Sequence, residues 1–513
     1  MSGGQTTVLA AALRRANATA RDGVVHSSDI SRRDRELLAN RGCLREIIRG
    51  WYALTTPDTR PGDTVVWHST FWPFVAAYLS ERFGRRYCLS AEASLDLWIG
   101  RTSTPEQLIV ITATGGASTI TLPTDTSILS YLNPTGMPNE TATVRGLQVM
   151  PLGVALARTP PTFFRLDPLT AEIALRQVRR EEISRGLLAN WNAAAAGRLA
   201  GGLRHIGRPV DADALVADCE TAGYALTPEN PFERSPELAG VAIDWPQAAR
   251  IHALWHRMRG GVLGARPSAP ARLPSLEEYL VQADALYQSD AYNSLSIEGY
   301  RVTPELIVRI AAGDWNPERA EDEKQRDAMA ARGYSAAHKL VLASIRKVFA
   351  GETPGKAFED SLADWYRALF GSSIQAGILE AWQIAGYRNG PVYIQNSGHV
   401  PPNHEAVPAC MDTLFSLLKE EPEPWVRAVL GHFVFVFIHP YTDGNGRIGR
   451  FLMNLMLASG GYPWTVIRVE HRAAYMTALE RASVDGMIAS FAQFVAGQMS
   501  TPPVSSRLAR DSE

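Results

Sequence analysis

The sequence predicts a multi-domain, mainly α-helical protein that also contains a small α/β region, and three observations support this. The chain has 513 residues, more than one hydrophobic core usually supports, which suggests about three domains. Its 46% hydrophobic and 20% charged residues are typical of a soluble globular protein. Helical periodicity runs through most of residues 274–500, whereas the first half also holds short strand-like runs.

The first 62 residues have the element order of a small DNA-binding fold. Helical segments at 7–18 and 31–38 precede two short apolar strands that flank Arg49-Gly50. Two helices followed by a hairpin is the order of a winged helix-turn-helix. Through residue 60 the chain has ten arginines, no lysine and six acidic residues, so this segment is basic although the whole chain is not. A basic surface of this kind attracts DNA phosphates.

The run from Gly42 to Tyr52 adds a resemblance. Its pattern, G-x-L-x-x-I-x-R-G-x-Y, resembles the N-terminal domain of AbiEi-type antitoxins, which bind their own operators. The candidate phosphate contacts are the arginines of this segment, namely Arg32, Arg33 and Arg49, with Arg35 and Arg45 beside them. Small winged folds also serve as protein-docking modules, and that alternative stays open.

Residues 63–165 are predicted to form an α/β region, because strand-like runs at 107–112, 119–122 and 147–150 alternate with helical segments such as 74–83. A helical segment within it resembles the helix that follows the winged domain in the antitoxin-like proteins. We find no catalytic constellation in this region.

The second half is predicted to be helical almost throughout. Its most periodic segments lie at 276–288, 327–350, 360–385, 406–419, 425–438 and 447–459. A stretch rich in proline, alanine and arginine precedes them and is typical of a connector.

The twelve residues from His439 to Arg450, HPYTDGNGRIGR, combine the groups needed to bind a nucleoside triphosphate beside a hydroxyl nucleophile. The glycines around Asn445 let backbone N–H groups approach phosphate oxygens, and the N-terminus of the following helix favours anions. Asp443 can hold Mg²⁺, which prefers hard oxygen ligands. Arg447 and Arg450 are three residues apart, so on a helix both can contact phosphates from one side. His439 can accept a proton near neutral pH.

This run matches the pattern HPFx(D/E)GN(G/K)RxxR, with Tyr441 in place of phenylalanine, and the chain therefore resembles a Fic-domain protein. Fic proteins transfer AMP from ATP to a hydroxyl side chain of a target protein. The resemblance implies an all-helical Fic fold, with His439 as the general base and Asp443 as the Mg²⁺ ligand. It also implies nucleotide-binding roles for the turn and the two arginines: Gly444, Asn445, Gly446, Arg447 and Arg450.

A second motif, Ser294-Leu-Ser-Ile-Glu298-Gly299, matches the (S/T)xxxE(G/N) inhibitory pattern of the same family. A carboxylate placed against Arg450 would form a charge-assisted pair and occupy the position that the γ-phosphate needs. The resemblance therefore implies a Fic domain inhibited within its own chain. The bland alternative is a helix end with glycine as its C-cap.

Between the two motifs, Val392, Tyr393 and Ile394 lie in a short run bounded by glycine and proline, in which apolar residues alternate. That pattern predicts a β-hairpin and resembles the Fic flap, which pairs with the target segment as an added strand. The alternative is a surface hairpin without function.

Composition indicates which partners and which cellular environment the protein is suited to. The formal net charge of −2 gives no global preference for nucleic acid or anionic membrane. Four widely separated cysteines predict neither a disulfide framework nor a metal site, and favour a reduced, cytoplasmic setting. No apolar run is long enough to span a bilayer, so no membrane association is expected.

The expected domains are a winged helix-turn-helix-like domain at 1–62, an α/β antitoxin-like region at 63–165, a helical connector at 166–264, a linker at 265–274, the Fic domain at 275–500 and a disordered tail at 501–513. The favoured function is an autoinhibited protein adenylyltransferase that uses ATP, Mg²⁺ and a target protein with an accessible Ser, Thr or Tyr. The alternative is a DNA-binding, antitoxin-like regulator whose Fic domain senses a nucleotide or removes AMP. The target, the direction of AMP transfer and a homo-oligomeric state stay open.

Overall fold

The computed structural model describes residues 2–57, 64–101, 103–239, 245–270, 272–313 and 325–499, and the expected tail at 501–513 lies outside these ranges. The chain divides into two compact units. The N-terminal unit comprises Met1–Ala249 together with Tyr393–Pro401, and the C-terminal unit comprises Arg250–Val392 and Pro402–Glu513.

The N-terminal unit begins with the predicted helices and hairpin, together with one strand that was not predicted. The elements are α1 (Ser2–Thr19), β1 (Val24–His26), α2 (Arg32–Asn40), β2 (Leu44–Ile48) and β3 (Trp51–Leu54). The strands pair antiparallel in the order β1-β3-β2.

Helix α2 starts where the side chain of Ser31 accepts a hydrogen bond from the Asp34 backbone N–H, at 3.1 Å. Arg15 of α1 donates two hydrogen bonds to the Asp34 carboxylate, at 2.9 and 2.7 Å. These contacts fix the two helices to each other.

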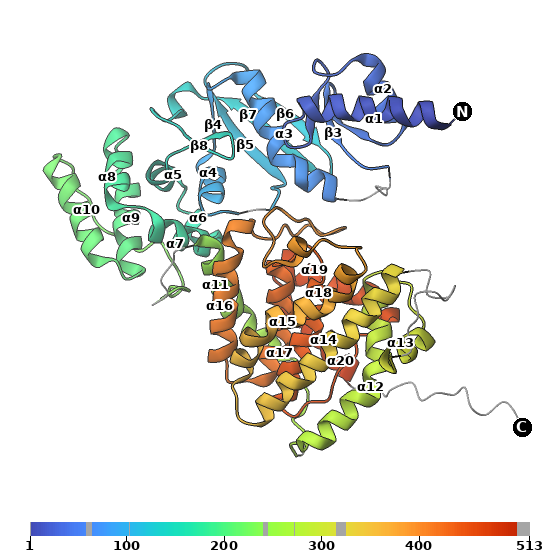
Figure 1. Ribbon diagram of the computed structural model, residues 1–513. Helices are drawn as coiled ribbons and strands as arrows, with labels where there is room; N and C mark the ends of the chain where they lie inside the picture. The colour runs from blue at the N-terminus through green and yellow to red at the C-terminus, as the bar shows by residue number, and fades with distance from the viewer. Residues whose placement is uncertain are drawn as a thin grey trace, which may run out of the picture. The chain divides into compact units, whose positions relative to one another are not determined.

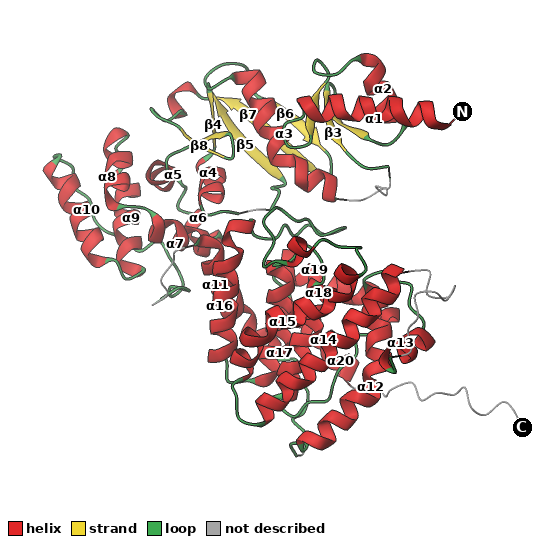
Figure 2. Cartoon of the chain, in the orientation of Figure 1, coloured by secondary structure: helices red, strands yellow, loops and turns green. Residues whose placement is uncertain are grey.

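A second, mixed sheet follows, as Figures 1 and 2 show. Its elements are α3 (Val65–Phe83), β4 (Tyr87–Leu89), α4 (Ala91–Trp98), β5 (Gln107–Thr112), β6 (Ser118–Leu122) and β7 (Thr126–Leu132). The strand order is β4-β5-β7-β6, with β5 and β7 parallel. A short hairpin of β8 (Ala142–Val144) and β9 (Leu147–Val149) completes the α/β region. The predicted strands at 107–112, 119–122 and 147–150 are confirmed as β5, β6 and β9.

The rest of the N-terminal unit is helical. It contains α5 (Leu152–Arg158), α6 (Phe163–Leu166), α7 (Pro168–Gln177), α8 (Arg180–Ala189), α9 (Ala193–His205) and α10 (Pro209–Thr221). The helix α11 (Pro246–Leu263) begins in this unit and continues into the C-terminal unit.

In the described ranges, the C-terminal unit contains helices and no strand (Figure 2). They are α12 (Leu276–Ile297), α13 (Pro304–Ala311), α14 (Gln325–Phe349), α15 (Pro354–Gln375), α16 (Val407–Glu420), α17 (Pro424–Ile438), α18 (Asn445–Ala458), α19 (Arg472–Val484) and α20 (Ile488–Met499). Helices α17 and α18 pack against each other, and nearly all of their side chains are buried. The run HPYTDGNGRIGR connects these two core helices.

Two predictions about the second half of the chain are wrong. The helix predicted at 360–385 ends at Gln375, because the chain turns at Gly377 with φ 68°. The predicted β-hairpin flap contains no strand. Its backbone turns back at Asn396 (φ 57°), and Ser397 N–H bonds to the Ile394 carbonyl at 3.3 Å. The Ser397 carbonyl accepts a hydrogen bond from the Thr64 hydroxyl, at 3.1 Å, within the N-terminal unit.

No helix in the described ranges is both long and apolar enough to cross a membrane.

Candidate active site

His439 ends the buried helix α17 in a left-handed conformation, with φ 53° and ψ 60°. A positive φ is uncommon outside glycine, and such backbone strain is concentrated at functional sites. The His439 N–H still closes the last helical turn on the Phe435 carbonyl, at 3.0 Å. The ring therefore leaves the helix at a fixed point, just before the glycine-rich turn.

The protonation state of His439 suits a base. Its Nδ1 lies 3.2 Å from the Val436 carbonyl, which only accepts, so Nδ1 carries the proton and Nε2 keeps its lone pair. Burial lowers the pKa of His439 to about 4; the Val436 hydrogen bond opposes this shift, and the charge on Arg388 adds to it. The imidazole is therefore neutral near pH 7 and able to accept a proton.

Arg388 holds the backbone at the start of the HPYTDGNGRIGR run in place. Its backbone N–H donates to the Pro440 carbonyl at 2.9 Å, and its Nε donates to the His439 carbonyl at 2.8 Å. The same side chain donates to the carbonyls of Gly390 and Pro402. Arg388 is not among the site residues that the sequence predicts. A buried arginine that binds backbone carbonyls from several segments has no local sequence signal.

The turn that follows His439 is held by side chains on both sides. Asn445 accepts from the Tyr441 N–H at 3.0 Å and donates to the Tyr441 carbonyl at 2.8 Å. The Tyr441 ring stacks on Tyr366 of α15, with ring centroids 3.6 Å apart. Gly444 precedes α18 with φ 84°, and no side chain caps the first turn of that helix. The Asn445 side chain thus shapes the turn, and the helix N-terminus keeps its N–H groups for an anion.

Asp443 and Arg447 form an ion pair at 3.0 Å across one turn of α18. The Asp443 side chain is 56% exposed and Arg447 only 1%. Asp443 also accepts from the Gly444 N–H at 2.6 Å. An exposed carboxylate at this position can share a cation with substrate phosphates. The described residues contain no cluster of three or more His, Cys, Asp or Glu side chains that could hold a metal by themselves.

Arg450 is engaged by the predicted inhibitory motif. Its Nη2 donates to a Glu298 carboxylate oxygen at 2.7 Å and to the Ser294 carbonyl at 3.1 Å, and its Nε donates to the Ser294 hydroxyl at 2.9 Å. Burial alone would lower the pKa of Arg450, but the Glu298 carboxylate holds it above its usual value. Gly299 follows the end of α12 with φ 85°.

The position of Glu298 bears directly on the turn. A Cβ placed on Gly446 would lie 2.3 Å from the same Glu298 oxygen and 3.2 Å from Arg450 Nη1. The carboxylate thus lies against the glycine of the predicted anion-binding turn.

Two buried donors here have no partner among the described residues, namely Arg450 Nη1 and Arg447 Nε. Unpaired donors on buried arginines are costly. Phosphate oxygens are the acceptors that arginines bind best. The donor set therefore fits a polyphosphate.

The other predicted site residues are more exposed to solvent than Arg447 and Arg450. Val392, Tyr393 and Ile394 are half-buried, and the division between the two compact units falls directly after Val392. Arg32, Arg33 and Arg49 are exposed, and Arg32 forms an ion pair with Glu36 at 2.8 Å.

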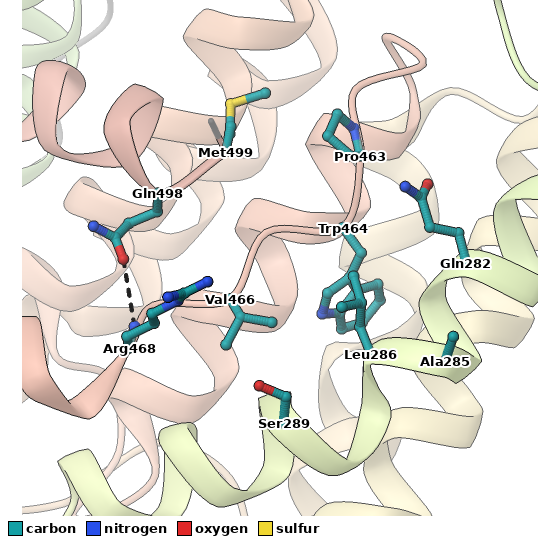
Figure 3. Close-up of a pocket in the computed structure, with 10 residues that line it drawn as sticks. All are labelled: Gln282, Ala285, Leu286, Ser289, Pro463, Trp464, Val466, Arg468, Gln498 and Met499. Atoms are coloured by element: carbon teal, nitrogen blue, oxygen red, sulfur yellow. Dashed lines mark hydrogen bonds between the residues drawn. The ribbon is translucent and has the colours of Figure 1, made fainter. Parts of the chain in front are cut away.

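A cavity of about 220 Å³ is lined in part by α12, and Figure 3 shows the side chains that line it. Trp464 and Leu286 are among them, and the Gln498 side chain accepts from the Arg468 N–H at 3.5 Å. None of the predicted site residues lines this cavity, so it is separate from the arginine-rich site.

A family model described as the Fic/DOC family matches residues 359–457, a range that contains His439, the turn and both arginines. This part of the chain is a Fic/DOC-family domain. The inhibitory motif lies outside the matched range.

The Fic domain is similar to curated proteins named protein adenylyltransferase Fic. Identity is 38% over 141 residues to the Nematostella vectensis protein and 37% over 114 residues to the Aedes aegypti protein. The matches cover 27% and 21% of this chain, and 31% and 22% of those proteins. The chain thus spans less than a third of their length.

Solved structures of Fic proteins are also similar. Fic-1 (aa134–508) from C. elegans matches with a TM-score of 0.36 and 19% identity, covering 68% of this chain and 88% of that one. A Fic-domain-containing signaling protein from Bacteroides thetaiotaomicron matches with a TM-score of 0.36 and 20% identity, covering 48% and 92%.

Proposed function

We propose that the Fic domain transfers AMP from ATP to a Ser, Thr or Tyr hydroxyl of a target protein. The observation that carries this proposal is that one twelve-residue run holds a neutral imidazole on His439 and buried, unpaired donors on Arg447 and Arg450. A proton acceptor beside a polyphosphate site is the requirement for phosphoryl or nucleotidyl transfer to a hydroxyl. The similar proteins named protein adenylyltransferase favour the nucleotidyl case.

The proposed reaction assigns one task to each group. His439 Nε2 takes the proton of the target hydroxyl while its oxygen attacks the α-phosphate of ATP. The bond between the α- and β-phosphates breaks, pyrophosphate leaves, and AMP stays on the target. The N-terminus of α18 and Arg447 bind the phosphates during this step, and Arg450 binds the γ-phosphate.

Asp443 is the residue that would hold Mg²⁺ together with the phosphates, because it is the exposed carboxylate on the turn. The cation would neutralise phosphate charge. Arg447 shares the Asp443 carboxylate and keeps it oriented toward the turn.

Glu298 is proposed to inhibit the site. It takes one donor of Arg450 and lies against Gly446, so its negative charge occupies space close to where phosphate oxygens would bind. Like charges at that distance repel, and the γ-phosphate would be displaced.

A second function is proposed for the N-terminal unit, namely binding of double-stranded DNA. The supporting observation is the order helix, strand, helix, hairpin, with the three predicted arginines exposed on α2 and at the turn between β2 and β3. Such a module would direct the Fic domain to a DNA-bound target or regulate a gene.

The transferase proposal is tested by incubating the purified chain with labelled ATP and Mg²⁺ in a lysate, followed by mass spectrometry for AMP adducts. Glu298→Gly is expected to label target proteins, and Glu298→Gly with His439→Ala is expected to lose about 10²- to 10⁴-fold of that labelling. Unchanged labelling without His439 would overturn the assignment of the base. Absence of adducts with Glu298→Gly would overturn AMP transfer.

A further inference from the structure

The residue after the inhibitory motif contacts the second phosphate-binding arginine. The chain leaves α12 through Gly299, and the guanidinium carbon of Arg447 then lies over the ring of Tyr300, 5.1 Å from its centroid. On α15, the Phe370 ring lies under the same guanidinium carbon at 5.0 Å. Two aromatic rings from separate elements thus bind one buried cation.

Contacts of this kind attract the charge without using its N–H groups. A cation–π contact depends on the ring quadrupole, so the donors of the guanidinium stay available for acceptors. The structure shows this division in Arg447: Nη2 donates to Asp443, whereas Nε has no partner among the described residues. The rings restrict where the guanidinium lies, and its free edge can bind a phosphate.

The Tyr300 ring is itself held from outside. The guanidinium carbon of Arg326, an exposed residue near the start of α14, lies over it at 5.3 Å from the centroid. The Tyr300 ring therefore contacts two cations, the buried Arg447 and the exposed Arg326. Its position does not depend on Arg447 alone.

We propose that Tyr300 is a positioning residue that holds Arg447 ready for a nucleotide phosphate. This inference rests on the proposed nucleotide site. Two neighbouring residues of one short segment would then have opposite effects. Glu298 accepts a hydrogen bond from an N–H group of Arg450, whereas Tyr300 orients Arg447 without occupying any of its N–H groups. The contrast follows from chemistry, since a carboxylate competes with phosphate for the same N–H groups and an aromatic ring does not.

The test measures ATP binding directly, so it does not depend on transfer to a target. The parent protein is Glu298→Gly with His439→Ala, which can bind ATP and Mg²⁺ without turnover. Titration calorimetry should show that Tyr300→Leu raises the Kd for ATP about fivefold to tenfold, as expected for loss of one partly buried cation–π contact. Tyr300→Phe keeps the ring and should stay within about twofold of the parent.

Two controls assign the effect to Arg447. Tyr292→Leu makes the same change at a half-buried tyrosine on α12 and should leave the Kd unchanged. In a background that carries Arg447→Ala, Tyr300→Leu should have no further effect, because groups in direct contact are not additive.

An unchanged Kd in Tyr300→Leu would overturn the inference, as would tighter binding, which would make the ring a second inhibitory contact. An equal loss with and without Arg447 would also overturn it, since the ring would then act on the fold in general. Failure of AMP transfer in Glu298→Gly, with these Kd shifts intact, would instead reject the transferase proposal alone.

Discussion

Replacing Glu298 by glycine should convert the chain into a more active transferase. The Glu298 carboxylate is 25% exposed and Arg450 is 3% exposed, and they are joined by one hydrogen bond of 2.7 Å. Glycine removes the carboxylate and leaves the other partner of Arg450, Ser294, unchanged. The variant therefore tests a single contact.

The size of the effect follows from that contact. A hydrogen bond between charged groups contributes about 1.5–3 kcal/mol, and each 1.36 kcal/mol corresponds to a tenfold change. Because Glu298 is partly solvated, the lower half of this range is expected. Removing the carboxylate should then raise AMP incorporation about 13-fold to 45-fold.

The same change should lower stability when no nucleotide is present. Loss of Glu298 leaves a buried guanidinium without its counter-charge, which is unfavourable. ATP supplies that charge, so the melting temperature of Glu298→Gly should rise more on addition of ATP than that of the wild type.

The assay compares AMP incorporation at fixed ATP and Mg²⁺ for the wild type, Glu298→Gly, Glu298→Gln and the double variant with Arg450→Ala. Glu298→Gln keeps the shape and removes the charge, and Glu305→Gln removes an exposed charge from α13 as a matched control. AMP incorporation by the double variant should be lower than that by Glu298→Gly, since the γ-phosphate contact is then lost. Equal incorporation by the wild type and Glu298→Gly would refute the inhibitory contact. Loss of an AMP-removing activity in Glu298→Gly would favour the reverse reaction instead.

Three further outcomes are expected. Because the pKa of His439 is lowered to about 4, kcat/KM of the Glu298→Gly protein should stay flat from about pH 5.5 to 8, and a midpoint near 6.5 would contradict the buried neutral base. Burial raises the pKa of Asp290 to about 6 although Tyr334 donates to it at 2.7 Å, so the protonated carboxyl stabilises the fold below pH 4 and that contribution is lost as pH rises to 6. The free energy of unfolding of Asp290→Asn should therefore rise by up to about 3 kcal/mol relative to that of the wild type between pH 4 and 7 in chemical denaturation. A difference that stays constant over this pH range would contradict the raised pKa of Asp290. Arg33→Ala with Arg49→Ala should weaken binding to DNA from upstream of the protein's own gene and reduce its salt dependence in a gel-shift titration, and salt-insensitive binding by the wild type would favour a protein-docking role.

The sequence predicted the helices on either side of the HPYTDGNGRIGR turn, because they are long and strongly periodic. The proposed base, carboxylate, glycines and arginines all lie within these twelve adjacent residues, so the candidate site could be located from local sequence. It also predicted that Glu298 would meet Arg450, a contact that spans 152 residues, although only through a family resemblance. No spacing rule brings residues so far apart in the chain together.

The sequence did not predict the residues that support this turn. Tyr300, Phe370 and Arg388 reach it from three segments, and each contact arises from tertiary packing. The predicted flap strands failed for a related reason. Alternating apolar residues indicate a strand only where the tertiary context favours an extended ladder, and the structure assigns no strand to this segment. Strand β7 (TSILSYL) was missed because two adjacent apolar residues at its centre break the alternation, and its pairing with β5 and β6 stabilises the strand.

The way α12 is anchored limits how the proposed inhibition could be released. Asn293 accepts from the Val469 N–H at 2.8 Å, and Arg472 donates to the Ile297 carbonyl at 2.8 Å, so the last turn of α12 is fixed to the segment after α18 just before and within the predicted inhibitory motif. Leu295 and Ile297 are buried in the core of the C-terminal unit. Undocking the helix would expose these side chains and break several hydrogen bonds, whereas moving the Glu298 side chain breaks one. Since Glu298 is the C-cap of α12 and is followed by Gly299, its side chain can rotate away without disturbing the helix. Release by a ligand or partner therefore requires only a local competitor for the Glu298 carboxylate or for Arg450.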